Sequence, residues 1–438
     1  MTGRMSAVFL LVLLAAAAAS VPMAAQLNTG TIVGVVHDAS GLVVPGAEVQ
    51  VTSERTADVR TTTTNEVGRF SLPALPAGSY TVRVSAKGFQ TAERKGVVLT
   101  SNEYLSLGDI VLQVGSTTET ITVSAGTAVI QTASAEVSAL IENKQLNMLM
   151  TRGRDVLSLL RVLPGVAQNV DPISMGSEIG SSSPSISGLR NNDNTITLDG
   201  QVSSDSDNVN VHISSIAIDS IEEVKVLTNS FQAEYGRNAG AQVSIVSRSG
   251  TQEFHGNLSW FKRHEQFNAN SFFNNLNGLP RPLYRYNNWT GTLGGPVYIP
   301  RRFNVDKNKL FFFFTFDEWR ALEPQAARRT TMPTDLERRG DFSQSLDVSG
   351  RPFTIYDPAT QRPLAGNLVP ASRINPLGRA MLEVFPQPNF LDRAISRGNY
   401  NYQYQESREN PKRLFQLKND WNITSNDRLM LRWRKWRQ

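Results

Sequence analysis

The sequence predicts three folded parts: an all-β sandwich, a mixed α/β domain, and the first strands of an incomplete antiparallel transmembrane β-barrel. Short strands separated by Gly and Pro turns follow one another from residue 30 to about residue 113. Two helix-like segments and three alternating strands follow between residues 142 and 250. After residue 251, apolar and polar residues alternate with the period of a β-strand, and aromatic residues lie near the strand ends.

The net charge of +5 is concentrated at one end of the chain. Residues 408–438 contain nine Lys or Arg and three Asp or Glu, a local surplus of +6, so the rest of the chain is nearly neutral. A local surplus does not produce the field of a nucleic-acid-binding protein, and we expect no nucleic-acid partner. The chain has no cysteine, which excludes disulfides and thiolate metal sites and suits an exported protein.

The N-terminus has the pattern of a secretory signal peptide. Arg4 precedes an apolar run over residues 7–19, which is followed by small residues up to residue 26. We expect cleavage near Ala25, so that residues 1–25 are removed; a retained membrane anchor is the alternative. No later apolar run approaches the roughly 20 residues of a transmembrane helix. A membrane-spanning mature chain would therefore cross with strands.

Residues 27–114 predict a small antiparallel β-sandwich that folds on its own. Strands are predicted at 32–36, 47–51, 68–72, 80–84 and 97–99, with Gly and Pro turns between them. Two sequence stretches resemble the carboxypeptidase-regulatory-like, transthyretin-like domain: GTIVGVVHDASGLVVPGAEVQV and NEVGRFSLPALPAGSYTVRVSAKGF. That resemblance implies no catalysis, because zinc peptidases need clustered ligands and the histidines are scattered. We predict no catalytic residue, no metal site and no cofactor; the histidines are His37, His212, His255 and His264.

Residues 127–250 predict the mixed α/β domain. The two helix-like segments are 142–149 and 154–163, and Pro164 and Gly165 end the second. Strands are predicted within 194–200, 216–226 and 234–246. The stretches SGLR, TLDG, IEEVKV and EYGRNAGAQVSIVSRSGT, in this order, closely resemble the plug domain of TonB-dependent outer-membrane receptors. In that family, plug arginines commonly face the barrel wall and pair with acidic residues there. The resemblance implies this role for Arg190 and Arg237; ordinary solvated arginines are the alternative.

A linker, residues 115–126, joins the two domains and contains one extended segment. An isolated strand with unpaired backbone on both edges can recruit a partner strand. In position and amino-acid sequence the segment is similar to the TonB box, which engages an inner-membrane-powered transducer across the periplasm. The alternative is that it forms the last strand of the sandwich or the first of the plug. The residues concerned are Glu119, Thr120, Ile121, Thr122, Val123, Ser124 and Ala125.

Residues 251–438 predict about five barrel strands, at 254–263, 289–299, 309–319, 413–423 and 427–434. In the last two, apolar side chains form one face: Phe415, Leu417, Trp421, Ile423, Leu429, Leu431 and Trp433. Polar side chains dominate the other face, which suits a barrel with lipid outside and a polar lumen. The alternative, a basic strand with tryptophans for single-stranded nucleic acid, does not suit a secreted chain with a plug.

Two further stretches resemble the Oar-like branch of the receptor family, whose members carry the same sandwich. They are YNNWTGTLGGPVYIP and NKLFFFFTFDEWR. Residues 320–412 are rich in Pro, Asn and Arg, with one short helix predicted at 376–384. We predict that this segment is a long extracellular loop. Five strands cannot close a barrel, which needs at least about eight. We expect the N-terminal portion of a longer receptor; the alternatives are a fragmentary gene model and a sandwich-plus-plug protein without a barrel.

The resemblance implies energy-coupled import through the cell outer membrane, with the sandwich and the box in the periplasm. The expected partners are a TonB-type energy transducer, outer-membrane lipid and an extracellular ligand of unknown identity. The alternative is an envelope adhesion protein that binds polymers without transport. Aromatic residues would stack on sugars or a hydrophobic chelate, or else form the interface girdle or loop core. They are Trp260, Phe272, Phe273, Tyr284, Tyr286 and Trp289.

Overall fold

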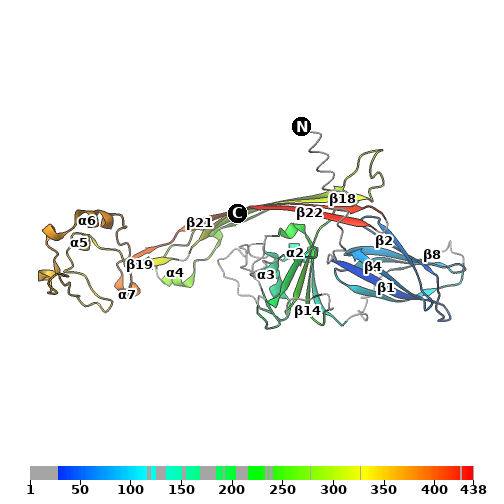
Figure 1. Ribbon diagram of the computed structural model, residues 1–438, viewed down its shortest axis with the longest axis horizontal. Coiled ribbons are helices and arrows are strands. Elements are labelled where there is room, and N and C mark those ends of the chain that lie inside the picture. Colours follow the sequence, from blue (N-terminus) through cyan, green and yellow to red (C-terminus); the bar gives the residue numbers. More distant parts are fainter. Residues whose placement is uncertain are drawn as a thin grey trace, which may run out of the picture. The chain divides into compact units, whose positions relative to one another are not determined.

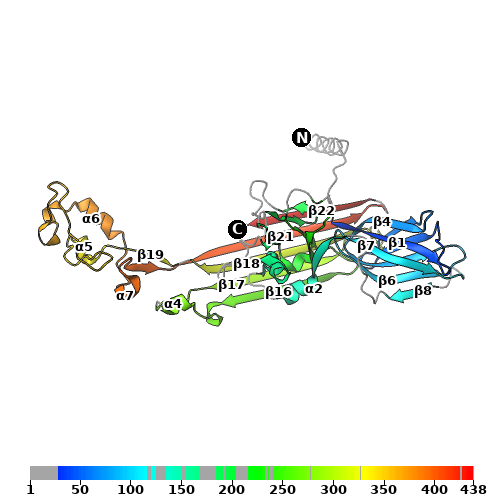
Figure 2. The same ribbon diagram turned by 90° about the horizontal axis from the view of Figure 1, so that it is seen from below.

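The computed structural model falls into two compact units (Figures 1 and 2). The first comprises Met1–Ser259, Trp289–Glu318 and Arg413–Arg437, and the second Trp260–Asn288 and Trp319–Lys412. None of the helices in the described ranges is both long and apolar enough to cross a membrane. The expected signal peptide, residues 1–25, lies outside the described residues. These are 28–115, 120–124, 135–149, 154–167, 184–190, 193–203, 216–231, 235, 240–276, 278–325, 327–424 and 427–437.

The first unit begins with a β-sandwich, drawn in blue to cyan in Figure 1. One sheet has the order β4-β1-β7, with β1 (Thr29–Asp38), β4 (Arg69–Pro76) and β7 (Tyr104–Leu112). The other has the order β3-β2-β5-β6-β8, with β2 (Glu48–Ser53), β3 (Val59–Thr63), β5 (Gly78–Ser85), β6 (Thr91–Leu99) and β8 (Thr120–Ser124). Alternate residues of both sheets form one apolar core, including Ile32, Phe70, Leu112, Val49, Val82 and Leu99.

The sandwich differs from the sequence expectation in three respects. It is not wholly antiparallel, because β1 pairs with β7 in parallel and β6 pairs with β8 in parallel. It also extends beyond residue 114 to include β8, and the sequence interpretation missed β3 and β7. Side-chain alternation is the same in parallel and antiparallel strands, so the pattern carries no information on strand direction.

A mixed α/β domain follows, drawn in green in Figure 1. Its sheet has the order β13-β12-β15-β14-β9, with β9 (Val137–Glu142), β12 (Thr195–Leu198), β13 (Gln201–Val202), β14 (Ile221–Asn229) and β15 (Gln242–Ser247). The core of this domain joins Val224, Val243 and Ile196 of the sheet to Leu146 and Leu160 of the helical segments. The helical segments are α2 (Asn143–Met148), α3 (Val156–Leu159), η2 (Leu160–Val162) and η4 (Ile218–Ser220).

Both helices predicted in this domain are present, at slightly shorter length. Asp155 caps α3 by accepting hydrogen bonds from the backbone N–H groups of Leu157 and Ser158, so the helix begins directly after it. Two short strands of two residues each, β10 (Val166–Ala167) and β11 (Ser185–Ile186), pair antiparallel. The predicted α/β character of this domain is confirmed.

Five long strands form a third sheet, here called the wall sheet. Its order is β16-β17-β18-β21-β22, so strands that are neighbours in the chain are neighbours in the sheet. Their number is the one expected from the sequence. β21 and β22 pair antiparallel, with Leu417 opposite Trp433 and Trp421 opposite Leu429. The bounds are β16 (His255–His264), β17 (Arg285–Pro296), β18 (Leu310–Pro324), β21 (Ser407–Asn422) and β22 (Arg428–Arg437).

The second unit contains the longer connections between wall strands. Residues 320–412, predicted to be a long extracellular loop, include several short helices and strands. Arg338 donates hydrogen bonds to the carbonyl groups of Leu382, Phe385 and Pro386, which ties α5 (Asp335–Arg338) to α6 (Pro376–Glu383). The helix predicted at 376–384 is present as α6. The elements are η5 (Glu265–Phe267), α4 (Phe272–Leu276), β19 (Arg328–Thr330), α5 (Asp335–Arg338), η6 (Ala365–Asn367), η7 (Ala371–Arg373), α6 (Pro376–Glu383), α7 (Arg393–Ser396) and β20 (Tyr402–Tyr404).

Candidate functional site

In the described part of β21 from Phe415 onward and in β22, one face of the wall sheet is polar and the more buried, and the other face is apolar and the more exposed. In β21, Gln416 and Lys418 are 0% and 5% exposed, whereas Trp421 on the other face is 40% exposed. In β22, Leu431 and Trp433 are 57% and 55% exposed. The face that would be buried in an ordinary soluble sheet is therefore the exposed one. This arrangement confirms the predicted alternation and suits strands with lipid on one side and a polar interior on the other.

Asp199 lies at the edge of the α/β sheet, where two parallel strands end. β12 and β15 run parallel, with Leu198 beside Ile245, so the residues that follow them meet. Asp199 and Gly200 form the turn into β13, and their positive φ angles of 48° and 81° suit Asp and Gly. The Asp199 carboxylate accepts hydrogen bonds from the N–H (2.8 Å) and the hydroxyl (2.6 Å) of Ser247.

Two cations of the wall sheet meet this carboxylate. The guanidinium of Arg432 lies 2.5 Å from Asp199 Oδ2, and the Nζ atom of Lys418 lies 3.6 Å from Oδ1. Arg432 also donates to the carbonyl of Leu198 at 3.1 Å, and Lys418 donates to the carbonyl of Ser247 at 3.0 Å. The side chains of Asp199, Lys418 and Arg432 are 5%, 7% and 10% exposed. We call these four residues, including Ser247, the Asp199 cluster.

The electrostatic balance at Asp199 favours the ionised carboxylate. Burial by itself raises the pKa of Asp199, because it removes water from the charged form. The charges of Lys418 and Arg432 and the hydrogen bonds from Ser247 outweigh burial, so the pKa lies below its ordinary value. Asp199 therefore holds a negative charge opposite two positive charges at neutral pH.

A second polar contact joins the α/β domain to β16. Asp219, in η4, pairs with Arg154 of the same domain at 2.7 Å, and both side chains are buried or nearly so. The hydroxyl of Ser259 in β16 donates to the same carboxylate oxygen of Asp219 at 3.2 Å. Arg248 adds a cation–π contact, with its guanidinium carbon 5.2 Å from the ring centroid of Phe313. Ser259 and Arg248 thus add two further contacts between the α/β domain and the wall sheet, each of which includes a polar or charged group.

Of the two arginines predicted to contact the wall, only Arg190 lies within the described residues, and its side chain makes no contact with the wall there. Arg190 is exposed, its backbone N–H donates to Asp193, and no side-chain partner for it is seen among the residues that the structure describes. Arg237 lies outside the described residues. The ion pairs of the Asp199 cluster run in the opposite sense, with the acid on the α/β domain and the cations on the wall. Sequence reasoning missed Asp199, although two cations on the inner face of the strands indicated a buried acid opposite them.

The predicted TonB-box segment is an edge strand of the sandwich. Thr120–Ser124 forms β8, which pairs in parallel with β6 in the register Thr91 with Thr120 through Lys95 with Ser124. One backbone edge is therefore paired, which corrects the expectation of two open edges; β8 is the last strand of its sheet. This corresponds to the alternative in which the segment closes the sandwich. Glu119 and Ala125 lie outside the described residues.

The aromatic residues considered as ligand contacts divide into two groups. Tyr284 and Tyr286 are 5% and 1% exposed and belong to the interior of the second unit. Phe272 and Phe273 of α4 are exposed, and Trp260 and Trp289 lie on the exposed face of the wall sheet. Within the described ranges, no group of three or more His, Asp or Glu residues is placed to hold a metal ion.

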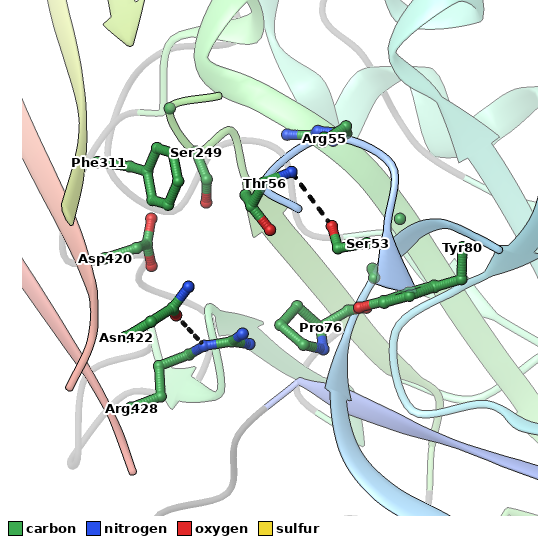
Figure 3. Close-up of a pocket in the computed structure, with 13 residues that line it drawn as sticks. Ser53, Arg55, Thr56, Pro76, Tyr80, Ser249, Phe311, Asp420, Asn422 and Arg428 are labelled. Carbon is green, nitrogen blue, oxygen red and sulfur yellow. Dashed lines mark hydrogen bonds between the residues drawn. The ribbon is translucent and has the colours of Figure 1, made fainter. Parts of the chain in front are cut away.

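A small cavity of about 90 Å³ lies within the first unit (Figure 3). Arg55, Thr56 and Tyr80 of the sandwich line one side, and Asp420 and Arg428 of the wall sheet line the other. A water molecule takes up about 30 Å³ in the liquid, so the cavity has room for a few waters. A volume of this size is too small for most organic ligands.

Three domain families match consecutive parts of the chain. Residues 31–113 match the Carboxypeptidase regulatory-like domain, residues 130–243 the TonB-dependent Receptor Plug Domain, and residues 246–438 the Outer membrane beta barrel domain. The TonB-dependent transporter Oar of Myxococcus xanthus is 25% identical over 316 residues. That match covers 67% of this chain and 27% of the relative, so the chain spans about a quarter of the relative's length.

Two solved structures also resemble parts of the chain. The ferric enterobactin receptor of Pseudomonas aeruginosa is 14% identical, with 67% of this chain and 32% of that chain covered and a TM-score of 0.36. A cohesin–X-dockerin complex from Acetivibrio cellulolyticus is 22% identical over 20% of this chain and 58% of that chain, with a TM-score of 0.17. Both TM-scores are low, so neither likeness bears on function.

Proposed function

We propose a function from the premise that this chain belongs to the TonB-dependent outer-membrane receptors, the family to which its three matched domains assign it. The α/β domain is the plug, the wall sheet is barrel-type, and the protein is located in the outer membrane. The proposed function is energy-coupled import of a ligand. Binding and gated passage need no covalent step, so no catalytic group is assigned.

The observation that supports this proposal best is the polar contact between plug and wall at the Asp199 cluster. A plug that moves during import must exchange its contacts with the wall for contacts with water. Ion pairs and hydrogen bonds can be exchanged in this way, because water replaces each partner, whereas an interlocked apolar core cannot. The buried carboxylate and its two cations therefore suit a plug that is held firmly at rest and can still rearrange.

For the energy source, we propose that a TonB-type transducer pairs with the segment 119–125. β-strand addition derives most of its affinity from main-chain hydrogen bonds. β8 has one edge on β6 and the other edge outermost in its sheet, so the transducer strand either adds to the outer edge or displaces β6. The sandwich and this segment then lie in the periplasm, and the ligand enters from the opposite side.

Proline substitutions at successive positions of β8 test this proposal in the full-length receptor. The N–H groups of neighbouring residues in a strand point to opposite edges, so Ile121→Pro and Thr122→Pro each remove a donor from a different edge. Loss of a paired donor costs roughly 3 kcal/mol or more, which is about a hundredfold in affinity. We expect at least one proline variant to abolish uptake while ligand binding at the cell surface is unchanged.

The matched controls are Ile121→Ala and Thr122→Ala, which keep the N–H groups and should retain most uptake. Uptake that survives both proline substitutions would refute the assignment of the transducer segment. Surface binding that disappears with them would show general misfolding and count equally against it. A wild-type receptor that binds a polymer but imports nothing would favour the adhesion function.

A further inference from the structure

Strand β14 of the plug carries two charged residues on the face opposite its core. Val224 and Val226 belong to the plug core, and strand alternation places Glu223 and Lys225 on the other face. Glu223 is 7% exposed and Lys225 is 3% exposed. Charged side chains are rarely buried so deeply without partners. Here the sandwich covers this face of β14.

The turn that precedes β7 of the sandwich supplies the covering groups. The backbone N–H of Ser101 donates to Glu223 Oε1 at 2.7 Å. The carbonyl of Asn102 accepts from Lys225 Nζ at 3.4 Å, and the same ammonium pairs with Glu136 of the plug at 2.7 Å. These two sandwich residues therefore bind the two buried charges of β14 through main-chain groups.

A second turn of the sandwich contacts both the plug and the wall. It joins β2 to β3 and carries Arg55 and Asp58, two charges of opposite sign. Arg55 pairs with Glu222 of β14 at 2.5 Å, and its carbonyl accepts from the N–H of Gln252 at 3.2 Å. Asp58 pairs with Arg428, the first residue of β22, at 2.5 Å. One short turn thus bridges the plug and the wall strand.

The contact beside this turn is incompletely packed and contains several charged groups. Figure 3 shows Arg55 and Thr56 on one side of the cavity, with Asp420, Asn422 and Arg428 on the other. Within the wall sheet, the Nε–H group of Arg428 donates a hydrogen bond to Asn422 Oδ1 at 2.8 Å. Asp420 Oδ2 is buried and has no hydrogen-bond partner among the described residues, so it is available to water in the cavity. A contact that is incompletely packed loses less van der Waals attraction on opening than a close-packed core does.

We propose that β14 and the start of β22 form a docking surface for the sandwich, and that the docked sandwich is a clamp that is released before the plug rearranges. The docking contacts are those of Ser101, Asn102, Arg55 and Asp58. The clamp's role in transport rests on the proposed import function, whereas docking itself does not. While the sandwich is docked, the plug strand and the wall strand are tied to the same rigid turn.

Crosslinking in the full-length receptor tests the clamp, because the chain has no native cysteine. Arg55→Cys with Glu222→Cys places two thiols at partly exposed positions on opposite sides of the docking surface, each side chain being 30% exposed. A short bis-methanethiosulfonate reagent bridges them and is cleaved by reductant. We expect the bridge to form in cells, to block uptake, and to leave surface ligand binding unchanged; reductant should restore uptake.

The matched control is Gln50→Cys with Thr61→Cys, which lie opposite each other in β2 and β3 of the same sandwich. This bridge does not cross the docking surface and should leave uptake unchanged. Failure of the Arg55→Cys and Glu222→Cys pair to crosslink while the control pair does so would overturn docking. Full uptake by the bridged receptor would overturn release. If the unmodified receptor shows no transducer-dependent uptake, the proposed function fails and the clamp loses its role, but crosslinking still decides docking.

Charge reversal provides a second test that does not depend on transport. Arg55→Glu places two negative charges together and should lower crosslinking at a second pair, Asp58→Cys with Arg428→Cys, by about two- to fivefold. Adding Glu222→Arg restores the opposite charges and should restore crosslinking. Equal crosslinking in the single and double reversals would contradict a specific docking surface.

Discussion

The plug presents a buried carboxylate to each of its two neighbours, and the two carboxylates differ in what compensates their charge. At the wall, Asp199 meets Lys418, Arg432 and two hydrogen bonds from Ser247. At the sandwich, Glu223 meets the backbone N–H of Ser101, and the nearby Lys225 is already paired with Glu136.

This difference gives the two carboxylates opposite pKa shifts. Burial raises the pKa of Glu223, and the charge of Glu222 raises it further, while Ser101 and Lys225 offset only part of this. The pKa of Asp199 is lowered, because its two cations outweigh burial. A buried charge that is paired with opposite charges is held by them. A buried charge with too few partners is stabilised when it returns to water. We therefore expect the wall contact to be the firmer of the two and the sandwich contact to open first.

The largest expected effect comes from Asp199→Asn. The change leaves Lys418 and Arg432 buried opposite a neutral amide, and breaking a buried ion pair in this way costs roughly 3–5 kcal/mol. We expect a matching loss in the unfolding free energy of the full-length receptor, measured by denaturant titration. Asp193→Asn, a change of the same chemistry at a half-buried position of the plug, should have little effect. A loss below about 1 kcal/mol at Asp199 would remove the difference between the two interfaces.

Glu223→Ala should weaken sandwich docking by a smaller amount. It leaves the N–H of Ser101 without its acceptor, which costs roughly 1–3 kcal/mol if the group stays buried. Glu223→Gln keeps an acceptor oxygen and removes the under-compensated charge, so docking should be as strong as in the wild type or stronger. The readout is the fraction of docked receptor, from spin-label distances between Thr61→Cys and Thr228→Cys. Equal weakening by both substitutions would show that the charge itself stabilises docking.

The two interfaces should respond to acid in opposite ways. The pKa of Glu223 is raised on docking, so docking takes up a proton and strengthens as the pH falls towards the ordinary value of 4.5. The pKa of Asp199 is lowered, so the wall contact is complete above 3.8 and weakens only as the pH falls through the lowered pKa. The same spin-label distances should show more docked receptor at pH 5 than at pH 7, with a flatter profile for Glu223→Gln. Docking that decreases on acidification would contradict the assignment.

The smallest effect is expected for the exposed ion pair of α6. Arg379 and Glu383 are spaced four residues apart, and their side chains are 64% and 66% exposed. Such pairs contribute about 0.5 kcal/mol or less. Glu383→Gln should leave the unfolding free energy of the receptor almost unchanged in the titration used for Asp199. A loss as large as that of Asp199→Asn would mean that burial is not what separates the two cases.

Local patterns explain which parts of the fold could be predicted. The alternation at residues 413–434 is local, and the exposure of Trp433 beside the burial of Gln416 agrees with it. The helix at 376–384 was also recognisable, because Asn375 and Pro376, which begin it, are local signals. The order of the domains followed from changes in strand and helix periodicity along the chain.

Partners far apart in the chain were decided only by the tertiary structure. Asp199 and Arg432 are separated by 233 positions, and nothing in TLDG indicates which cation it meets. The same holds for β8, whose parallel partner β6 could not be read from its alternation. Arg338 likewise orders the connection between β18 and β21 by binding carbonyl groups 44 to 48 positions away.

The sequence by itself determined the periodicity of each strand and helix, and therefore which side chains share a face. Periodicity depends only on backbone geometry, which repeats within a few residues. The tertiary structure decided which faces meet, and hence that Asp199 of the plug lies opposite Lys418 and Arg432 of the wall. A buried charge can be satisfied by any opposite charge or dipole within reach, so its partner is selected by the packing of whole domains.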